Sequence, residues 1–168
     1  MLVDTERLNT LISNFLMAAK LEQRPANAGL TAIDFSVFVE KFIKDFQLHL
    51  PEGNSLTLRL EPGIFAKMDV EGMEMVLRNL LENAFLYSTA SPEVQVELCR
   101  SGKNCTLTVT DNGKGLEVKE LKNIFRMFYR VRTTGETIRG TGLGLYIVKS
   151  IVERHKGSIK VKSDGAGR

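Results

Sequence analysis

The sequence predicts an α+β fold: a two-layer α/β sandwich with a mixed sheet and helices on one face, preceded by one amphipathic helix. Stretches in which apolar residues recur at three- and four-residue steps predict the helices. Short stretches of alternating apolar and polar residues predict the strands. A chain of 168 residues, 43% of them hydrophobic and 26% charged, is long enough to bury one core.

The first helix is expected over residues 4–22, within a segment 1–24 that is separate from the main domain. Its apolar residues fall on one stripe: Leu8, Leu11, Ile12, Phe15, Leu16 and Ala19. The stripe either docks on the domain's own core or forms half of a helical hairpin or dimer interface. Residues 25–30 interrupt the periodicity and predict a linker, so the main domain covers 31–168.

The main domain begins with a second amphipathic helix that Asp34 opens. Strands are expected over 56–60 and 64–68, and a third helix runs from a cap at Asp69 to Tyr87. The residues of the third helix that are predicted to face inward are Met73, Val76, Leu77, Leu80, Leu81 and Ala84.

Residues 94–98 and 106–110 alternate as the two strands of a hairpin. Cys99 and Cys105 flank its turn and could face each other, but two cysteines do not make a disulfide framework, and free thiols in a reducing cytosol are expected. No apolar run is long enough to span a bilayer, and no signal peptide is apparent. The chain is therefore expected to be cytoplasmic, which leaves membrane anchoring of a longer parent protein open.

Residues 112–140 are rich in glycine and charge, with one short helix near 117–125, and a loop of this length predicts a functional role. The segment has seven basic and three acidic residues, an excess of +4 against +3 for the whole chain. Such an excess suits a phosphate-bearing ligand or an acidic partner surface. A solvated basic loop is the alternative.

Alternating glycines at 140, 142 and 144 precede a helix expected over 143–154, which Gly157 is placed to end. A strand over 158–162 follows. Glycines leave backbone N–H groups open to an anion, and the N-terminus of a helix adds a favourable dipole. On this stretch alone, phosphate binding and an ordinary turn both remain open.

Asn79 and Asn83 lie four residues apart on the third helix, hence on one face. An amide beside a buried stripe must find polar partners. Its carbonyl oxygen also suits Mg²⁺, which takes further ligands from phosphates. Two exposed asparagines are the alternative.

Asp111 follows the strand 106–110 directly. A carboxylate at a buried strand end can accept a hydrogen bond from an exocyclic amine, which adenine offers and guanine does not in that place. Gly113 and Gly115 would let a flat base lie against the backbone. An ordinary D-N-G turn is the alternative.

Four motifs occur in order: N-x-x-x-N-A at 79–84, D-x-G-x-G at 111–115, F-x-x-F-Y-R at 125–130 and G-T-G-L-G-L at 140–145. Together they resemble the ATP-binding catalytic domain of sensor histidine kinases, within the superfamily that includes gyrase, Hsp90 and MutL ATPases. The resemblance covers about residues 31–168. It implies the Bergerat-type ATP-binding fold, with residues 112–140 as a mobile lid.

By this resemblance the cofactors are ATP and Mg²⁺, and Asn79 and Arg130 are the catalytic candidates. Asn83 would hold Mg²⁺, Asn79 would help to position the phosphates, and Asp111 would bind the adenine amino group. The other binding residues would line the base (Gly113, Gly115), pack near the nucleotide (Tyr87), contact the γ-phosphate (Arg130) or cradle the phosphates (Gly140, Thr141, Gly142, Leu143, Gly144, Leu145).

The position of Asn79 is typically a glutamate that activates water in the sister ATPases. Asparagine cannot be that base, which favours phosphotransfer over hydrolysis. The N-terminal helix resembles the end of the second helix of the family's dimerisation hairpin. Neither His49 nor His155 has the H-box context, so the phosphoacceptor is absent from this chain and the chain alone is not expected to autophosphorylate.

The predicted function is therefore the ATP-binding catalytic domain of a two-component sensor histidine kinase. The implied partners are ATP and ADP, a separate histidine phosphoacceptor (dimerisation) domain, a response regulator and a second copy in a homodimeric parent, with no nucleic acid. The alternatives are a stand-alone ATPase or anti-sigma-type serine kinase of the same superfamily, and a non-catalytic nucleotide-sensing or docking module.

The sequence departs from the family pattern in two places that matter. Leu86 stands where the family usually has a basic residue facing the phosphates, so phosphate affinity is expected to be weaker or to come from Arg130 and Lys114. The chain also ends where the family turns into a final strand, and that strand is expected to be missing.

Overall fold

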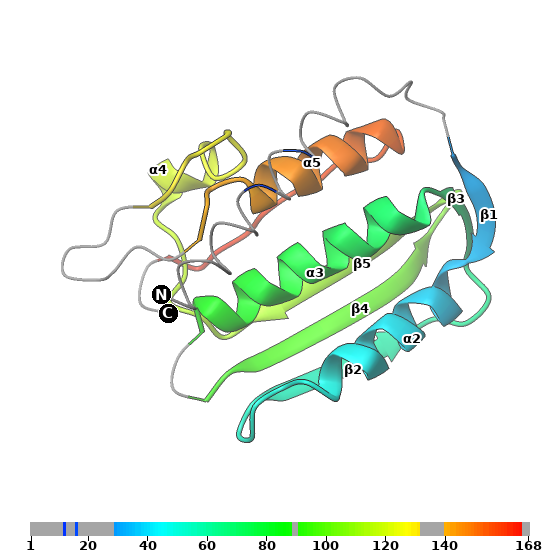
Figure 1. Ribbon diagram of the computed structural model, residues 1–168, viewed down its shortest axis with the longest axis horizontal. Helices are drawn as coiled ribbons and strands as arrows, with labels where there is room; N and C mark the ends of the chain where they lie inside the picture. Colours follow the sequence, from blue (N-terminus) through cyan, green and yellow to red (C-terminus); the bar gives the residue numbers. More distant parts are fainter. Residues whose placement is uncertain (1–11, 13–15, 17–28, 89–90, 132–139, 166–168) are drawn as a thin grey trace. The chain divides into compact units, whose positions relative to one another are not determined.

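The computed structural model describes residues 12, 16, 29–88, 91–131 and 140–165 (Figure 1). They fall into two compact units. The sheet unit contains residues 29–116 and 163–165, and the glycine-turn unit contains 117–131 and 140–162 together with Ile12 and Leu16. The predicted helix 4–22 lies outside the described residues except for Ile12 and Leu16, which are helical.

The sheet unit contains one three-stranded mixed sheet and one two-stranded sheet. β2 (Ser55–Leu60) is parallel to β4 (Glu93–Ser101), which is antiparallel to β5 (Asn104–Asp111). β1 (Thr31–Asp34) pairs antiparallel with β3 (Phe65–Met68). The mixed sheet and the 94–98/106–110 hairpin are confirmed, whereas β1 is an element that the sequence did not predict.

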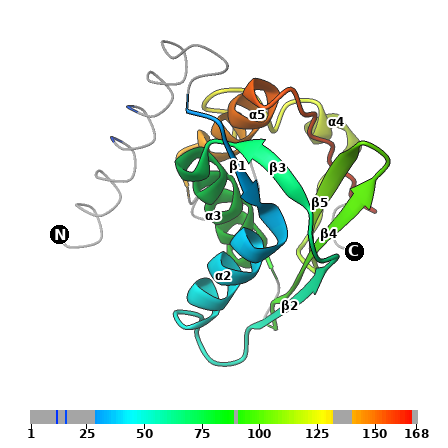
Figure 2. The ribbon, with the colours of Figure 1, turned by 90° about the vertical axis from the view of Figure 1, so that its right-hand side faces the viewer.

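Two helices of the sheet unit, α2 (Phe35–Gln47) and α3 (Val70–Leu86), cover one face of the mixed sheet (Figure 2). The buried residues Val94, Val96 and Leu98 of β4 share this face with Leu107 and Val109 of β5, because the register pairs them. Side chains opposite one another on antiparallel strands point to the same side of a sheet. The predicted two-layer sandwich with helices on one face is therefore confirmed for this unit.

Aspartates begin both helices as predicted. The Asp34 carboxylate accepts a hydrogen bond from the backbone N–H of Val37 at 3.0 Å, and that of Asp69 accepts one from Gly72 at 3.3 Å. Each bond satisfies an N–H group that has no partner within the helix. All six α3 residues that were predicted to face inward are buried except Leu80, which is half-buried.

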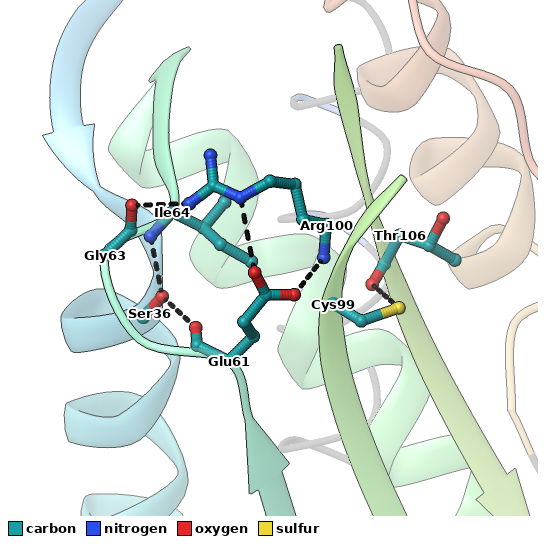
Figure 3. Close-up of polar contacts among 7 residues, drawn as sticks. All are labelled: Ser36, Glu61, Gly63, Ile64, Cys99, Arg100 and Thr106. Carbon is teal, nitrogen blue, oxygen red and sulfur yellow. Dashed lines mark hydrogen bonds and ion pairs between the residues drawn. The ribbon is translucent and has the colours of Figure 1, made fainter. Parts of the chain in front are cut away.

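A polar cluster links α2, the β2–β3 connection and β4 (Figure 3). The Glu61 carboxylate accepts hydrogen bonds from the Arg100 backbone N–H at 2.7 Å and from Arg100 Nε at 3.2 Å. The Ser36 hydroxyl donates to the Glu61 carbonyl at 2.7 Å and accepts from the Ile64 N–H at 3.1 Å. These bonds satisfy backbone groups of an irregular loop and fix the start of α2 on the sheet.

The two cysteines of the hairpin do not face each other. The register pairs Cys99 with Thr106 and Cys105 with Arg100, so the two thiols point to opposite faces of the sheet. Both are free, as expected. Burial raises the pKa of the Cys105 thiol.

The glycine-turn unit contains α4 (Val118–Leu121) and α5 (Gly144–Arg154). α4 is shorter than the helix predicted near 117–125, and residues 158–162 do not form the predicted strand. No helix among the described residues has both the length and the hydropathy needed to cross a membrane.

α5 ends just before Gly157, as predicted, but the left-handed residue of its C-terminus is Lys156. Lys156 adopts the left-handed conformation with φ 58°, and the N–H groups of Lys156 and Gly157 donate to Glu153 and Val152 at 2.9 Å each. These are the two bonds of a Schellman motif. Gly157 packs tightly here, since a Cβ there would lie 3.0 Å from Val152 Cγ1 and 3.2 Å from the Val152 carbonyl oxygen.

Candidate functional site

Asn79, Asn83 and Tyr87 form a stripe on α3, because steps of four residues return to the same helix face. The side-chain amide of Asn79 donates from Nδ2 to the Met75 carbonyl at 2.8 Å. Both asparagines are half-buried. Tyr87 is the C-cap of the helix and its side chain is 43% exposed. The stripe thus offers amide oxygens followed by an accessible aromatic ring.

Asp111 is the last residue of β5 and pairs with Val94, which places its side chain on the helix-covered face of the sheet. The prediction of a buried strand end is wrong, because Asp111 is exposed. It ends the ladder, where the helix layer no longer covers the strand. One carboxylate oxygen, Oδ1, accepts the backbone N–H of Gly113 at 2.8 Å. This bond holds the carboxylate at the start of the glycine motif.

Gly113 packs directly against the end of α3. A Cβ on Gly113 would lie 2.5 Å from Asp111 Oδ1 and 2.8 Å from the Tyr87 carbonyl oxygen, closer than side chains can approach. The next residue, Lys114, donates its backbone N–H to the same Tyr87 carbonyl at 3.1 Å. The glycine motif therefore packs against the C-terminal end of the α3 stripe within the sheet unit.

Gly115 has φ +67°, a conformation that few residues other than glycine adopt. A Cβ there would lie 2.2 Å from the Gly165 carbonyl oxygen. The next residue, Leu116, donates its N–H to Ser163 Oγ at 2.9 Å. Position 115 therefore requires glycine because of its positive φ value and because the backbone of Gly165 passes close to it.

Asn112 is a residue that sequence reasoning missed as a contributor to this site. Its side chain accepts the Glu93 N–H at 3.0 Å through Oδ1 and donates to the Ser91 carbonyl at 2.9 Å through Nδ2. Its own N–H donates to the Glu93 carbonyl at 3.2 Å. These bonds extend the β4–β5 pairing by one residue and fix Asp111. The D-N-G signal marked the turn but not this role.

The glycine-turn unit holds the second group of predicted residues. Gly140 and Gly142 have φ values of 85° and 72°. A Cβ on Gly142 would lie 2.8 Å from the Phe128 carbonyl carbon, and the Gly142 carbonyl accepts the Phe128 N–H at 2.9 Å. Thr141 Oγ1 accepts the Leu143 N–H at 3.2 Å. The turn therefore has one defined backbone path.

This turn leads directly into α5. The first hydrogen bond within α5 runs from the Ile147 N–H to the Leu143 carbonyl at 2.9 Å. The N–H groups of residues 144–146 therefore have no helical partner, and no side chain caps this end. Leu143 is buried and Leu145 is half-buried, so these residues offer backbone groups to a ligand. Unpaired N–H groups and the helix dipole favour an anion here.

Arg130 is a half-buried cation of the glycine-turn unit. Its Nε and Nη2 atoms are buried and have no hydrogen-bond partner among the described residues. The preceding residue is fixed, because the Tyr129 hydroxyl donates to the Glu120 carboxylate, which raises the pKa of Tyr129. A buried guanidinium is unfavourable unless an anion or other acceptor reaches it. The side chain is therefore prepared for an anionic ligand.

The sheet unit brings together six predicted residues: Asn79, Asn83, Tyr87, Asp111, Gly113 and Gly115. The glycine-turn unit contains the other seven: Arg130, Gly140, Thr141, Gly142, Leu143, Gly144 and Leu145. No cluster of three or more His, Cys, Asp or Glu side chains suited to a metal ion occurs in the part of the chain that the structure describes. The amide of Asn83 is the donor that fits a hard cation such as Mg²⁺, which accepts phosphate oxygens as its other ligands.

Comparison with known proteins places this arrangement in a family. The family described as "Histidine kinase-, DNA gyrase B-, and HSP90-like ATPase" matches residues 68–168. Sensor protein kinase WalK of Staphylococcus epidermidis is 31% identical over 98% of this chain, and its counterpart in Staphylococcus aureus is 30% identical over the same share. The chain spans 28% of the length of these two relatives.

Two solved structures share the fold. The histidine kinase AdeS of Acinetobacter baumannii superposes with a TM-score of 0.76 at 27% identity, over 98% of this chain and 76% of that one. Full-length ShkA in complex with AMPPNP gives a TM-score of 0.79 over 95% of this chain and 34% of that one; at 19% identity it supports the fold alone. The chain belongs to the family of histidine kinase-, DNA gyrase B- and HSP90-like ATPases, and within it to the ATP-binding domains of sensor histidine kinases.

Proposed function

We propose that this domain binds Mg·ATP and presents the γ-phosphoryl group to a histidine on a separate phosphoacceptor domain. The observation that carries the proposal is that the buried Nε and Nη2 atoms of Arg130 have no hydrogen-bond partner among the described residues. A family member with unpaired guanidinium nitrogens close in sequence to a glycine-rich turn is suited to binding a polyphosphate. Contact with the γ-phosphate would give these nitrogens acceptors and stabilise charge that develops during transfer.

The sheet unit supplies the recognition of the base and the metal. Asp111 accepts a hydrogen bond from the adenine amino group through Oδ2, since Oδ1 already accepts the Gly113 N–H. The Tyr87 ring packs near the nucleotide. Asn83 provides an amide oxygen to Mg²⁺, and Asn79 helps to position the phosphates. In the glycine-turn unit, the N–H groups of Gly140, Gly142 and Gly144 bind the phosphates. Mg²⁺, when bound, neutralises phosphate charge; every other contact comes from the protein.

Phosphotransfer is favoured over hydrolysis by the chemistry of Asn79. Its Nδ2 is engaged by the Met75 carbonyl, and an amide has no proton-accepting nitrogen that could activate water. The nucleophile that attacks the γ-phosphoryl group must therefore come from another segment. We assign that role to a histidine of a dimerisation domain, with a response regulator downstream, a homodimeric parent protein and a cytoplasmic location.

Calorimetric titration of the chain with ATP and GTP, with and without Mg²⁺, tests the nucleotide site. ATP binding strengthened by Mg²⁺ and not shared by GTP is expected, and Asp111→Asn should weaken it by about tenfold or more, because an amide donor would replace an acceptor. Arg130→Ala should weaken ATP binding by about tenfold and leave ADP binding unchanged. A folded wild-type chain that binds no ATP would refute the proposal.

Transfer itself is tested by adding a separate histidine phosphoacceptor domain and radiolabelled ATP. Acid-labile phosphate on that domain is expected, and its loss in Arg130→Ala would tie transfer to the cation. Acid-stable phosphate on a partner, or ATP hydrolysis without any transfer, would favour a serine kinase or a stand-alone ATPase instead.

A further inference from the structure

Lys114 places a cation at the end of the α3 stripe. Its Nζ lies 5.6 Å from the centre of the Tyr87 ring, within the range of a cation–π contact. Its backbone N–H donates to the Tyr87 carbonyl at 3.1 Å, which fixes the base of the side chain. The ammonium group therefore lies near the end of α3, beside the Tyr87 ring.

The last turn of α3 has no positive charge of its own that could bind a phosphate. The last turn of α3, all of which is described, contains no basic residue, and its C-terminal end carries the negative pole of the helix dipole. Leu86 is apolar and Glu82 is acidic and exposed. The nearest guanidinium on the helix, Arg78, lies over the Phe42 ring of α2 at 5.7 Å. A polyphosphate bound beside the end of α3 would meet the negative pole of the helix dipole, and the last turn offers it no cation.

The distance from Tyr87 to Asn83 along α3 is short enough for the Lys114 side chain to span. Asn83 lies one turn before Tyr87, about 6 Å along the helix axis at 1.5 Å per residue. A lysine side chain with its ammonium beside the Tyr87 ring can cover that distance by changing rotamer. It can then reach phosphates that share Mg²⁺ with Asn83. The contact with the ring keeps the ammonium close without burying its charge.

We propose that Lys114 is a phosphate-binding residue of this domain, which supplies from the D-N-G-K-G loop the positive charge that the last turn of α3 lacks. The inference rests on the proposed nucleotide site and adds a residue to it. It makes the affinity for nucleotides depend on the number of phosphates through a side chain outside the glycine-rich turn. Lysine suits this role because its ammonium acts as a mobile point charge.

The test compares Lys114→Gln with Lys103→Gln, which removes the same charge from the turn between β4 and β5. Calorimetry of both full-length variants with adenosine, AMP, ADP and ATP in the presence of Mg²⁺ separates charge from shape. Lys114→Gln should weaken ADP and ATP binding by about tenfold, the lower end for a hydrogen bond to a charged group, and leave adenosine unchanged. Lys103→Gln should match the wild type with every ligand.

A second variant tests whether the charge or the loop matters. Adding Leu86→Lys to Lys114→Gln places the positive charge on α3 in place of the loop and should restore ATP affinity. Equal losses for adenosine and ATP would overturn the inference, because Lys114 would then only hold Tyr87 in place. Wild-type ATP affinity in Lys114→Gln, with binding lost in Asp111→Asn, would overturn the inference and leave the proposed function standing. No ATP binding by folded wild-type protein would overturn both.

Discussion

Substituting alanine for Gly142 should destabilise the protein by about 2–5 kcal/mol. Two effects add. The φ value of 72° costs a residue with a Cβ about 1–2 kcal/mol. The new Cβ would also lie 2.8 Å from the Phe128 carbonyl carbon and 2.9 Å from the Tyr129 carbonyl oxygen, and both neighbours are backbone that cannot rotate away. Forcing such an overlap costs about 1–3 kcal/mol.

Gly102→Ala is the matched control, because Gly102 has a similar φ of +62° and no atom within 4 Å of its ideal Cβ. It should lose only the backbone share, about 1–2 kcal/mol. Urea unfolding followed by far-ultraviolet circular dichroism measures both variants. Calorimetry should also show weaker ATP binding in Gly142→Ala alone, since the turn that we propose binds the phosphates must shift. Equal stability losses in the two variants would refute the close approach of Gly142 to residues 128 and 129.

Three further predictions concern capping, a buried hydroxyl and pH. Lys156→Gly should stabilise the protein by about 0.5–1 kcal/mol in thermal unfolding, because Lys156 holds φ 58° at the end of α5; a loss of stability would contradict the Schellman geometry. Ser36→Ala should cost about 2 kcal/mol in urea unfolding, because it leaves the Ile64 N–H unpaired, whereas Ser88→Ala, which removes a bond to a carbonyl in its own helix, should change stability by less than about 1 kcal/mol. The Arg100 backbone N–H and guanidinium lower the pKa of Glu61, so the carboxylate stabilises the fold above its ordinary value of 4.5 and loses this effect as pH falls through the lowered value. Glu61→Gln should therefore lose less stability than the wild type on acidification below about pH 4.5, and parallel stability curves for the two proteins would exclude the effect.

The helices and most strands were predictable because their signals are local. The caps at Asp34 and Asp69 and the alternation in β4 and β5 each depend on a few neighbouring residues. β1 was not predictable, since its four residues form a strand only through pairing with β3. The strand expected over 158–162 had the right alternation, but alternation does not supply a hydrogen-bonding partner.

In the candidate site, too, the residue types could be predicted from the sequence, whereas their burial and contacts could not. The motif positions were assigned from the sequence, and the structure places six of them in the sheet unit. The exposure of Asp111 was mispredicted because burial depends on where the helix layer ends above the strand. Asn112 was missed, since its bonds to Ser91 and Glu93 join residues about twenty positions apart. The unpaired guanidinium of Arg130 is likewise a property of its surroundings.

The glycines of this chain show why a glycine motif alone is weak evidence for a phosphate site. Gly102 is required only by its φ value, and Gly113 only by the close approach of Tyr87 and Asp111. Gly115 and Gly142 are required by both. A sequence shows the same letter in each case, although an alanine would be rejected for a different reason. The turn at 140–144 differs because it leads into the unpaired N–H groups at the start of α5. This arrangement favours an anion, and neither a positive φ value nor a close approach of neighbouring atoms accounts for it.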